Sequence, residues 1–371
     1  MYPSTATENS AVPLATVLIC TFNRANLLGE TLESLSALNV STAIKWDVLI
    51  VDNRSTDHTP AVVRAFQSSY PVPLRYLYEP QQGKSYALNT GLNATRSRFV
   101  LFTDDDVRVS PDWLEAAIAP MVADGAVDYT GGPVFPIWEA PSPPWLRSDR
   151  GDLWGAIAIL DYGASSFVFE EQERIPIGAN MAVRRRLLDA VGGFDPELGR
   201  RGTSLLGQEQ AEFFCRARLA GARGRYVPEM SVHHHVPAQR LTRSYFRRWW
   251  FWKGISRARL HRAHPLSDGG AASEEIKRVA GFPVFAIAEM ARNVARCFGS
   301  LLRRDTPSAM EQEMMSVYYV GYAWEDRRLR ARSRRLGGKR SPLPASSTRQ
   351  QMGQRVSFEA RPEERGKVPQ S

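Results

Sequence analysis

The sequence predicts an α/β protein with a mainly parallel sheet between two layers of helices, followed by amphipathic helices toward the C-terminus. Two observations lead to this prediction. Short apolar runs alternate with stretches of helical spacing over residues 15–123, and each apolar run ends in polar residues. In open parallel sheets, ligands bind beyond the carboxyl ends of the strands. We therefore expect these polar ends to meet in one crevice.

The elements follow from this alternation. Strands with polar ends are expected at 15–24, 45–57, 74–79 and 98–106, and helices at 27–38, 59–69, 83–95 and 111–123. Residues 129–155 are rich in Pro, Gly and Trp and are expected to form an exposed loop region over the site. A strand, a helix and a Gly-Gly turn should follow over 175–199, then a helix over 205–221 and a strand over 223–236. Helical stretches follow, and 282–304 has apolar residues at helical spacing with arginines between them.

The bulk properties restrict the class of protein. The chain has 371 residues, of which 43% are hydrophobic, so it can bury the core of one large or two modest domains. Three cysteines without zinc spacing favour a reduced, cytosolic compartment. The N-terminus lacks a secretory signal pattern, and no uncharged apolar run approaches the roughly 18 residues of a membrane span.

The net charge of +9 arises mainly after residue 239. Zinc-finger, RNA-binding and basic-zipper patterns are not visible, so a nucleic-acid partner is not expected. We expect residues 240–330 to attach peripherally to a membrane surface, because basic and apolar residues recur there at helical spacing. The alternative is that these helices pack onto the rest of the protein, and the aromatic cluster 249–252 fits either interpretation.

Three consecutive aspartates, Asp104, Asp105 and Asp106, follow the apolar run 99–103. Two carboxylates about 6 Å apart repel by roughly 3 kcal/mol at an effective dielectric of about 20, so a bound cation would explain the arrangement. If the extended backbone continues, Asp104 and Asp106 point to one side and Asp105 to the other. That pair suits a hard divalent cation. The alternative is a solvated turn before the next helix.

Other polar residues are weaker candidates on their own. Asp52 at a strand end could accept an N–H from a base or form an Asx turn with Asn53 and Ser55. Lys84 could neutralise a diphosphate. In the run 233–235, alternation separates His234 from its two neighbours, and one of the three could complete a metal shell with Asp106.

Residues 209–216 carry three charged side chains at helical spacing. Glu212 and Arg216 are expected to form a structural ion pair. Glu209 lies near a helix start, where the helix dipole favours its ionised form, and is a candidate general base.

Taken in order, eight segments resemble the inverting, nucleotide-sugar-dependent glycosyltransferases of family 2, which have the GT-A fold. The segments are "TFNR", "VDNRSTD", "GKSYALNTGL", "FTDDDVRVSPDWL", "GANMAVRR", "GGFDPELG", "GQEQAEFFCRARLAGARGRYVPEMSVHHHV" and "RLTRSYFRRWWFWKG". The resemblance covers about Ala15 to Gly254. It implies a GT-A-type three-layer catalytic domain and transfer of a sugar from a nucleoside-diphosphate sugar, UDP-linked or similar, to an acceptor hydroxyl.

The resemblance also implies roles for individual residues. The nucleotide-sugar pocket would be lined by Thr21, Asn23, Arg24, Asp52, Gly83, Lys84, Asn89, Asp104 and Asp105. A Mg²⁺ or Mn²⁺ ion would be held by Asp104, Asp106 and His234. The sugar and acceptor side would be shaped by Gly178, Ala179 and Asn180. The family supplies its base from a Glu-Asp pair, which here reads Glu209-Gln210, so Glu209 is the predicted base.

The predicted organisation is a flexible N-terminus over 1–14, a GT-A catalytic domain over 15–238, a basic and amphipathic helical region over 239–334, and a disordered tail over 335–371. The predicted enzyme acts at the cytoplasmic face of the cell membrane, on an envelope glycan or a lipid-linked acceptor. Two alternatives remain open: a glycosyltransferase-like binding protein that has lost its base, and a nucleotidyltransferase.

Overall fold

The computed structural model describes residues 12–147, 151–169, 174–202, 204–264 and 276–335. Within them the main sheet has eight strands, in the order β3-β2-β1-β4-β9-β6-β10-β8. Their bounds are β1 Ala15–Thr21, β2 Trp46–Asp52, β3 Leu74–Tyr78, β4 Phe99–Asp104, β6 Val127–Gly131, β8 Phe167–Val168, β9 Asn180–Arg184 and β10 Arg223–Tyr226. β1 to β4 pair in parallel, and β9 runs antiparallel to β4. The predicted α/β class with a mainly parallel sheet is confirmed.

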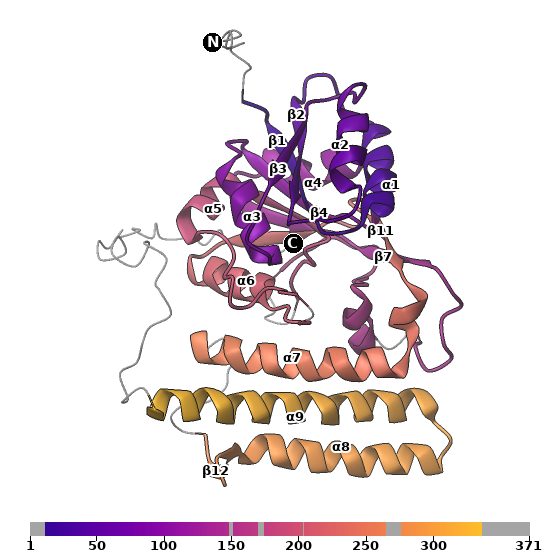
Figure 1. Cartoon of the computed structure of the whole chain (residues 1–371), viewed down its shortest axis with the longest axis vertical. Coiled ribbons are helices and arrows are strands. Elements are labelled where there is room, and N and C mark those ends of the chain that lie inside the picture. Colours follow the sequence, from indigo (N-terminus) through magenta and orange to yellow (C-terminus); the bar gives the residue numbers. More distant parts are fainter. Residues whose placement is uncertain (1–11, 148–150, 170–173, 203, 265–275, 336–371) are drawn as a thin grey trace, which may run out of the picture. The chain divides into compact units, whose positions relative to one another are not determined.

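Helices cover both faces of this sheet because successive strand side chains point to opposite sides (Figure 1). On one face, Val17 and Ile19 of β1 pack in a core with α1 (Ala25–Ser36), α2 (Thr59–Gln67) and α4 (Trp113–Ala123). On the other face, Leu18 packs with α3 (Lys84–Asn93), α5 (Arg185–Val191) and α6 (Glu209–Leu219). The result is the predicted three-layer arrangement.

A second, three-stranded sheet corrects two predictions. It consists of β5 (Val107–Val109), β11 (Val232–Val236) and β7 (Val134–Trp138), in the order β5-β11-β7. The predicted strand over 223–236 is therefore two strands in different sheets. Residues 129–155 are not an exposed loop region, since β6 and β7 occupy part of them and Trp145 and Leu146 lie in the core. A 3₁₀ helix, η1 (Gly151–Ile157), follows.

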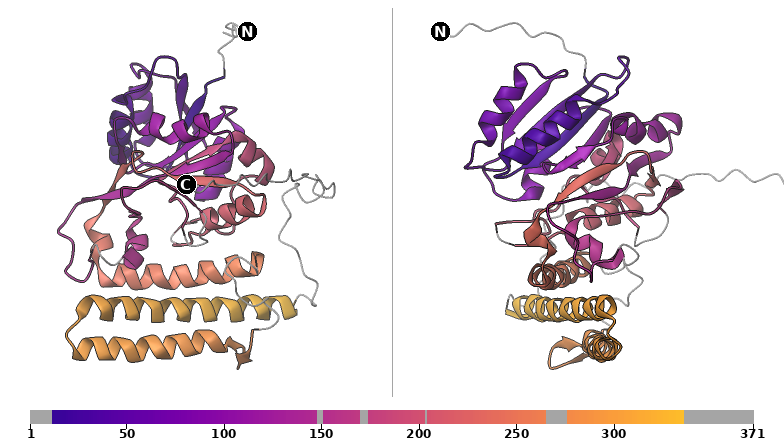
Figure 2. Two further views of the ribbon diagram at one scale, coloured as in Figure 1. Left: turned by 180° about the vertical axis from the view of Figure 1, so that it is seen from behind. Right: turned by 90° about the vertical axis from the view of Figure 1, so that its right-hand side faces the viewer.

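The C-terminal region is helical, as predicted. It contains η2 (Ala238–Leu241), α7 (Arg243–Ala263), the short strands β12 (Arg278–Val279) and β13 (Phe282–Pro283), α8 (Val284–Leu302) and α9 (Thr306–Arg335). Figures 1 and 2 show α7, α9 and α8 side by side, with α9 in the middle. None of the helices in the described ranges has the length and apolarity that a membrane span requires.

Helix α7 packs onto the sheet-containing part of the protein, residues 15–236, through its aromatic residues. Phe246 is fully buried and meets the ring of Trp145 edge-on, with ring centroids 4.9 Å apart. The Tyr245 hydroxyl donates a hydrogen bond of 3.1 Å to the carbonyl of Ala156. Trp250, in the ambiguous cluster 249–252, is buried as well. Phe246 and Trp250 of α7 therefore pack onto the protein, while the membrane attachment expected for residues 240–330 stays a prediction.

Two glycines set the approach of α7 to α9. A Cβ atom at Gly254 of α7 would lie 2.0 Å from the carbonyl oxygen of Tyr318, and one at Gly321 of α9 would lie 2.1 Å from that of Phe251. Both contacts are far below any real Cβ distance, and both involve backbone. The two helices therefore touch backbone to backbone at this glycine notch, and no other residue type fits there.

The predicted boundaries are only partly covered by the described ranges. Residues 1–11 of the expected flexible N-terminus and residues 336–371 of the expected tail lie outside them. The division of the chain at 238/239 stays a prediction.

Candidate active site

The strand register brings the polar strand ends together. Thr21 at the end of β1 pairs with Asp52 at the end of β2, and Cys20 pairs with Asp104 at the end of β4. All three strands run in the same direction, so their carboxyl ends share one edge of the sheet. Beyond β4, Thr103 pairs with Asn180, which opens the antiparallel strand β9. The crevice expected from the sequence is therefore formed by β1, β2, β4 and β9.

The three aspartates are neutralised by cations from different elements. The Lys84 ammonium donates to Oδ1 of Asp104 at 2.6 Å. The Nη1 of Arg24 donates to Oδ1 of Asp105 at 2.9 Å and also bonds Asp106. Because β4 ends at Asp104 and the chain turns before β5, the prediction that Asp105 points away from its neighbours is wrong. One arginine contacts both later aspartates.

Their pKa values differ according to their surroundings. Burial opposes ionisation of Asp106, but His234 and Arg24 outweigh it, and the pKa of Asp106 lies well below its usual range. Burial dominates at Asp105 and raises its pKa to about 6, against the attraction of Arg24. Desolvation also opposes ionisation of Asp104, yet Lys84 lowers the pKa of that carboxyl.

His234 reaches the site because β11 pairs with β5. The backbone N–H of His235 donates to the Asp106 carbonyl at 2.8 Å. This bond fixes β11 beside the turn formed by residues 104–106, which we call the aspartate turn. The expected alternation is confirmed, since His234 is buried while His233 is exposed. The His234 Nε2 lies 3.4 Å from Oδ2 of Asp106. Of the three histidines, His234 is thus the one that adjoins the carboxylates.

The residues at the ends of β1 and β2 hold the loops around the crevice. Both carboxylate oxygens of the fully buried Asp52 are occupied, by the Ser55 N–H at 2.8 Å and the Tyr76 hydroxyl at 2.7 Å. Asn23 has a left-handed backbone with φ 53°, and its Oδ1 accepts the Thr56 N–H at 2.7 Å. The turn interpretation of Asp52 therefore describes its present contacts.

The start of α3 is built around a glycine. Gly83 has φ 146°, a conformation that residues with a Cβ rarely adopt, and its N–H donates to Asn53 Oδ1 at 2.7 Å. This turn directs Lys84, the first residue of α3, toward Asp104. Desolvation opposes the charge of Lys84, but Asp104 and Glu209 outweigh it and raise the pKa of the ammonium. Lys84 therefore stays protonated at neutral pH.

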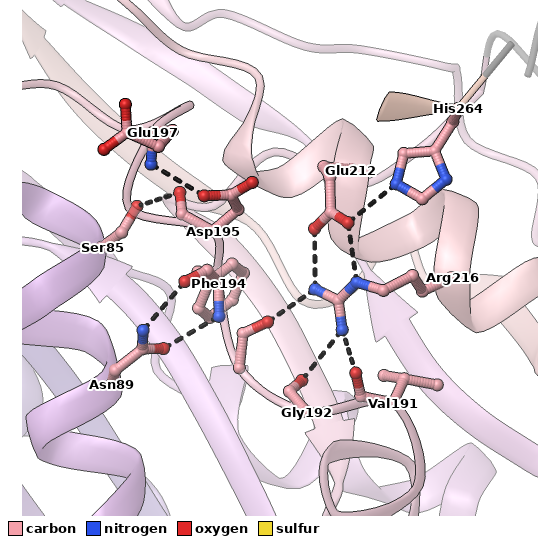
Figure 3. A network of polar contacts seen from close by, with 11 residues as sticks. Ser85, Asn89, Val191, Gly192, Phe194, Asp195, Glu197, Glu212, Arg216 and His264 are labelled. Atoms are coloured by element: carbon pink, nitrogen blue, oxygen red, sulfur yellow. Dashed lines mark hydrogen bonds and ion pairs between the residues drawn. The ribbon is translucent and has the colours of Figure 1, made fainter. Parts of the chain in front are cut away.

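Asn89 and the loop after α5 form a structural network (Figure 3). The Asn89 side chain donates to the carbonyl of Phe194 and accepts its N–H, each at 2.8 Å. The Arg216 guanidinium donates to the carbonyls of Val191 and Gly193. The loop is thus fastened to α3 on one side and to α6 on the other.

The same network confirms the predicted Glu212–Arg216 pair. The guanidinium makes two hydrogen bonds to the carboxylate, at 2.8 and 2.7 Å. His264, just after α7, adds a contact of 2.9 Å to Glu212 (Figure 3). Glu212 is therefore fully engaged in structure, which leaves Glu209 as the carboxylate of α6 that is free for chemistry.

Gly178 and Ala179 lie where β9 approaches the aspartate turn. The Ala179 carbonyl accepts the Thr103 hydroxyl at 2.9 Å. The fully buried Asn180 side chain accepts the Trp113 indole N–H and donates to the carbonyls of Pro133 and Met230. All of its polar atoms are thus used, and Asn180 acts on the crevice by fixing the backbone before it.

A small cavity lies between α3, β4 and α6. It is lined by Cys20, Lys84, Leu88, Phe102, Thr103, Asp104, Gly178, Met181 and Gln210. The Gln210 amide packs directly against Gly178, since a Cβ there would lie 1.8 Å from its Nε2. Position 210 is therefore the residue of α6 that borders the cavity.

Glu209 is the first residue of α6 and lies in the interior beside this cavity. Its Oε2 atom is buried without a hydrogen-bond partner. Burial raises the pKa of this carboxyl, although Lys84 acts in the opposite direction. A carboxylate that shares electrostatic contact with Lys84 and Asp104 has the chemical character of a proton acceptor.

Two arginines near the carboxylates were not found from the sequence. The charges of Asp106, Arg24 and Arg200 all act on Arg240, and burial lowers its pKa. Among the described residues, neither Arg240 nor Arg200 forms a side-chain hydrogen bond or ion pair. Both lie outside regular helices and strands of the main sheet, where no periodicity identifies them. Together with Arg24 they form an arginine cluster that suits a phosphate-bearing ligand.

The carboxylates have the chemistry to hold a divalent cation. Asp106 Oδ1 is buried and has no partner. Magnesium is commonly held by one or two protein carboxylates with phosphate oxygens and water completing its shell. In the described part of the chain no group of three or more His, Cys, Asp or Glu side chains forms a preformed metal site. The donor set therefore fits a cation that arrives with a phosphorylated ligand.

Comparisons with known proteins point in one direction. The family model "Glycosyl transferase family 2" matches residues 16–192. The chain is 30% identical to "Succinoglycan biosynthesis protein ExoM" of Rhizobium meliloti over 67% of this chain and 76% of that protein. It is 24% identical to "Glucosyl-dolichyl phosphate glucuronosyltransferase" of Haloferax volcanii, over 68% of this chain and 79% of that protein.

A solved structure has the same fold. The mannosyltransferase PcManGT from Pyrobaculum calidifontis, in complex with GDP-Man and Mn²⁺, superimposes with a TM-score of 0.56 at 22% identity. The match covers 85% of this chain and 88% of that one.

Proposed function

Because the chain belongs to glycosyl transferase family 2, an inverting class of enzymes, we propose that it transfers a sugar from a nucleoside-diphosphate sugar to an acceptor hydroxyl with the help of a divalent cation. The observation that carries this proposal is the meeting of the aspartate turn with Lys84, the arginine cluster and the buried Glu209 at one sheet edge. Cations for a diphosphate and a carboxylate for a proton are the two requirements of this reaction.

The donor is held by residues from the four strand ends. Thr21, Asn23, Arg24 and Asp52 border the nucleotide, with Asp105 beside them. Lys84 and Asn89 lie along the path of the sugar nucleotide, Asn89 by keeping its loop in position. Arg200 and Arg240 add positive charge for the diphosphate. Gly178, Ala179 and Asn180 form the backbone wall on the sugar and acceptor side.

Asp104, Asp106 and His234 would hold a Mg²⁺ or Mn²⁺ ion. The partnerless Oδ1 of Asp106 supports this assignment. When bound, the ion supplies Lewis-acid stabilisation of the charge that develops on the diphosphate.

Glu209 accepts the proton of the acceptor hydroxyl. The acceptor oxygen then bonds to the anomeric carbon while the bond from that carbon to the diphosphate oxygen breaks, and the nucleoside diphosphate departs with both electrons. Lys84, Arg24 and Arg240 neutralise the departing charge. Glu209 serves from the first helical residue only because its side chain is longer than the family's aspartate, which Gln210 replaces.

The acceptor we propose is an envelope glycan or a lipid-linked sugar. Support comes from the two relatives, whose names refer to succinoglycan biosynthesis and to a dolichyl phosphate-linked glucose. We propose that the enzyme works at the cytoplasmic face of the cell membrane, attached peripherally.

The test is an incubation of the purified full chain with a panel of nucleoside-diphosphate sugars, Mn²⁺ and membrane lipid extract. Release of nucleoside diphosphate together with a glycosylated lipid product supports the proposal. Donor binding without any release of nucleotide indicates a binding protein that has lost its base. Release of pyrophosphate indicates a nucleotidyltransferase.

A further inference from the structure

Helix α8 has an unusual way of packing on α9. Its buried positions are Ala286, Asn293 and Ser300, which are small or polar. A step of seven residues returns to nearly the same side of an α-helix, so these three form one narrow stripe toward α9. Phe285 adds to this contact, since its ring meets that of Tyr322 of α9 edge-on with centroids 5.5 Å apart.

The apolar residues of α8 lie on other sides of the helix. Ile287, Val294 and Leu301 each follow a buried residue by one position, which rotates them by about 100° away from the contact stripe. Apart from Phe285, the exposed large apolar side chains of α8 are Val284, Ile287, Val294, Phe298, Leu301 and Leu302. Leu302 is 76% exposed and Phe298 is 67% exposed. We call this set the α8 apolar face.

This face lies on the outermost of the three helices. α9 separates α8 from α7, as Figures 1 and 2 show, so the sheet-containing part of the protein does not cover it. A contiguous exposed apolar surface of this kind marks a site of interaction, since isolated proteins seldom carry large ones.

The charged residues between 284 and 304 are nearly all positive, and at 100° per residue Arg292, Arg296 and Arg303 lie on a side of the helix away from the α8 apolar face. Between 284 and 304 the chain has four arginines, Arg292, Arg296, Arg303 and Arg304, and one acidic residue, Glu289. Glu289 pairs with Arg292. The other three arginines form no ion pair within the described ranges. A surface of the opposite charge is therefore required for complementarity.

We propose that the α8 apolar face docks onto the surface of a bilayer that contains anionic lipids. An amphipathic helix with large apolar residues on one side and arginines on its polar side binds such a surface through both its apolar area and its charge. A second copy of the chain is the other possible occupant, and sedimentation analysis in the test below distinguishes the two. The inference rests on the proposed function only in placing the enzyme at a membrane.

If α8 docks on the bilayer, the membrane-binding surface expected over residues 240–330 is limited to a smaller part of that region. Phe246 and Trp250 of α7 are excluded from the attachment, because both side chains are buried in the protein. Attachment then depends on α8 and on the arginines that follow it.

The test is co-sedimentation of the full chain with phosphatidylglycerol–phosphatidylcholine vesicles and with pure phosphatidylcholine vesicles. We expect binding to the anionic vesicles. The double variant Phe298→Ser, Leu302→Ser should weaken it about tenfold, since binding scales with buried apolar area. Arg303→Gln with Arg304→Gln should remove most of the preference for anionic lipid. Leu219→Ser, at an 81% exposed leucine at the end of α6, is the matched control and should bind normally.

The outcomes separate this inference from the proposed function. Donor hydrolysis in detergent-free solution should be equal in the wild type and in all of these variants. The inference is overturned if the wild type ignores anionic vesicles, or if the double variant binds as the wild type does. It is also overturned if the double variant converts a dimer to a monomer in sedimentation analysis without changing vesicle binding.

Discussion

The Nζ atom of Lys84 donates a 2.6 Å hydrogen bond to Oδ1 of Asp104, and this pair joins the start of α3 to the end of β4. The pair neutralises a carboxylate that would otherwise repel a diphosphate. The charge of Glu209 also acts on Lys84 and raises the pKa of its ammonium. Lys84 therefore interacts both with an aspartate of the proposed donor site and with the proposed base.

Replacing Lys84 with glutamine should weaken the binding of nucleoside diphosphate by at least about tenfold. Asp104 then keeps its charge without its neighbour, and charges a few ångströms apart interact by several kcal/mol at an effective dielectric of about 20. Titration calorimetry with Mn²⁺ present measures the change. Lys45→Gln, at an exposed lysine before β2, is the control. Equal affinity of the Lys84 variant and the wild type would remove Lys84 from the donor site.

The substitution Asp106→Asn should abolish the metal dependence of nucleotide binding and lower turnover by at least about a hundredfold. The reason is that Asp106 Oδ1 is buried without a hydrogen-bond partner among the described residues, and loss of a Lewis acid costs several kcal/mol of transition-state stabilisation. Affinity for nucleoside diphosphate is compared with Mn²⁺ and with chelator. Asp112→Asn, just before α4, should retain the metal effect. Wild-type binding that is indifferent to chelator contradicts the metal site.

Turnover should depend on a group that titrates above 4.5, the ordinary value for a glutamate. Burial raises the pKa of Glu209, and a general base must be ionised, so kcat/KM should fall as the pH drops through this raised pKa. Glu209→Gln should lower turnover by about 10² to 10⁴, the usual scale for a lost general base, and should leave nucleotide affinity little changed. A pH–rate profile of the wild type and turnover of the variant provide the data.

The same shift affects stability. A carboxyl whose pKa is raised on folding favours the folded state below its unfolded pKa, and this contribution is lost as the pH rises through the folded pKa. Glu209→Gln should therefore raise Tm at pH 8 but not at pH 4. Gln210→Asp, which puts a carboxylate at the cavity wall, is the companion variant. If turnover survives Glu209→Gln, the base assignment is wrong.

Arg240→Met should weaken nucleoside diphosphate binding by about tenfold without lowering Tm. Arg240 has no ion pair among the described residues, and charge-assisted bonds to phosphate are among the stronger ones. Burial lowers the pKa of its guanidinium, because desolvation destabilises the charged form. A bound anion would stabilise that charge. Arg243→Met, three residues on and exposed, should behave as the wild type. A Tm loss without an affinity change would show that Arg240 is structural.

Asn89→Ala should lower the free energy of unfolding by about 2–4 kcal/mol, because it leaves both backbone groups of Phe194 without partners. Asn93→Ala, one turn further along α3 and exposed, should change it little. Urea denaturation gives the comparison. Any fall in donor affinity should arise only because the loop after α5 is no longer held in position by Asn89. A full loss of affinity with unchanged stability would mean that Asn89 contacts the sugar nucleotide itself.

The layers of the fold and the edge that carries the site could be predicted from sequence, because both follow from local patterns. Alternating side chains in β1 divide between the two cores, and the polar ends of β1, β2 and β4 come together through simple parallel pairing. The three consecutive aspartates were already candidate cation ligands from their charge and spacing, and the family resemblance supported the same interpretation.

Other features of the fold and of the candidate site could not be predicted, because they depend on contacts between segments that are far apart in the sequence. The turn at Asp105 and Asp106 arises because β5 leaves the main sheet to pair with β11, which lies more than a hundred residues later. β7 also pairs with β11, so a Pro- and Trp-rich stretch became strand and core instead of loop. Arg200 and Arg240 lie in segments without periodicity, and only the folded chain brings them to Arg24.

The glycine notch between Gly254 and Gly321 has a consequence for the distance between the proposed active site and a bilayer bound to α8. With backbone against backbone, α7 and α9 have no compressible side chains between them at this crossing. α7 packs on the sheet-containing part of the protein and α9 carries α8, so the three helices act as a spacer of fixed thickness. A bilayer bound to α8 would meet Asp106 at one constant distance, and only an acceptor whose reactive hydroxyl projects that far from the membrane could be glycosylated.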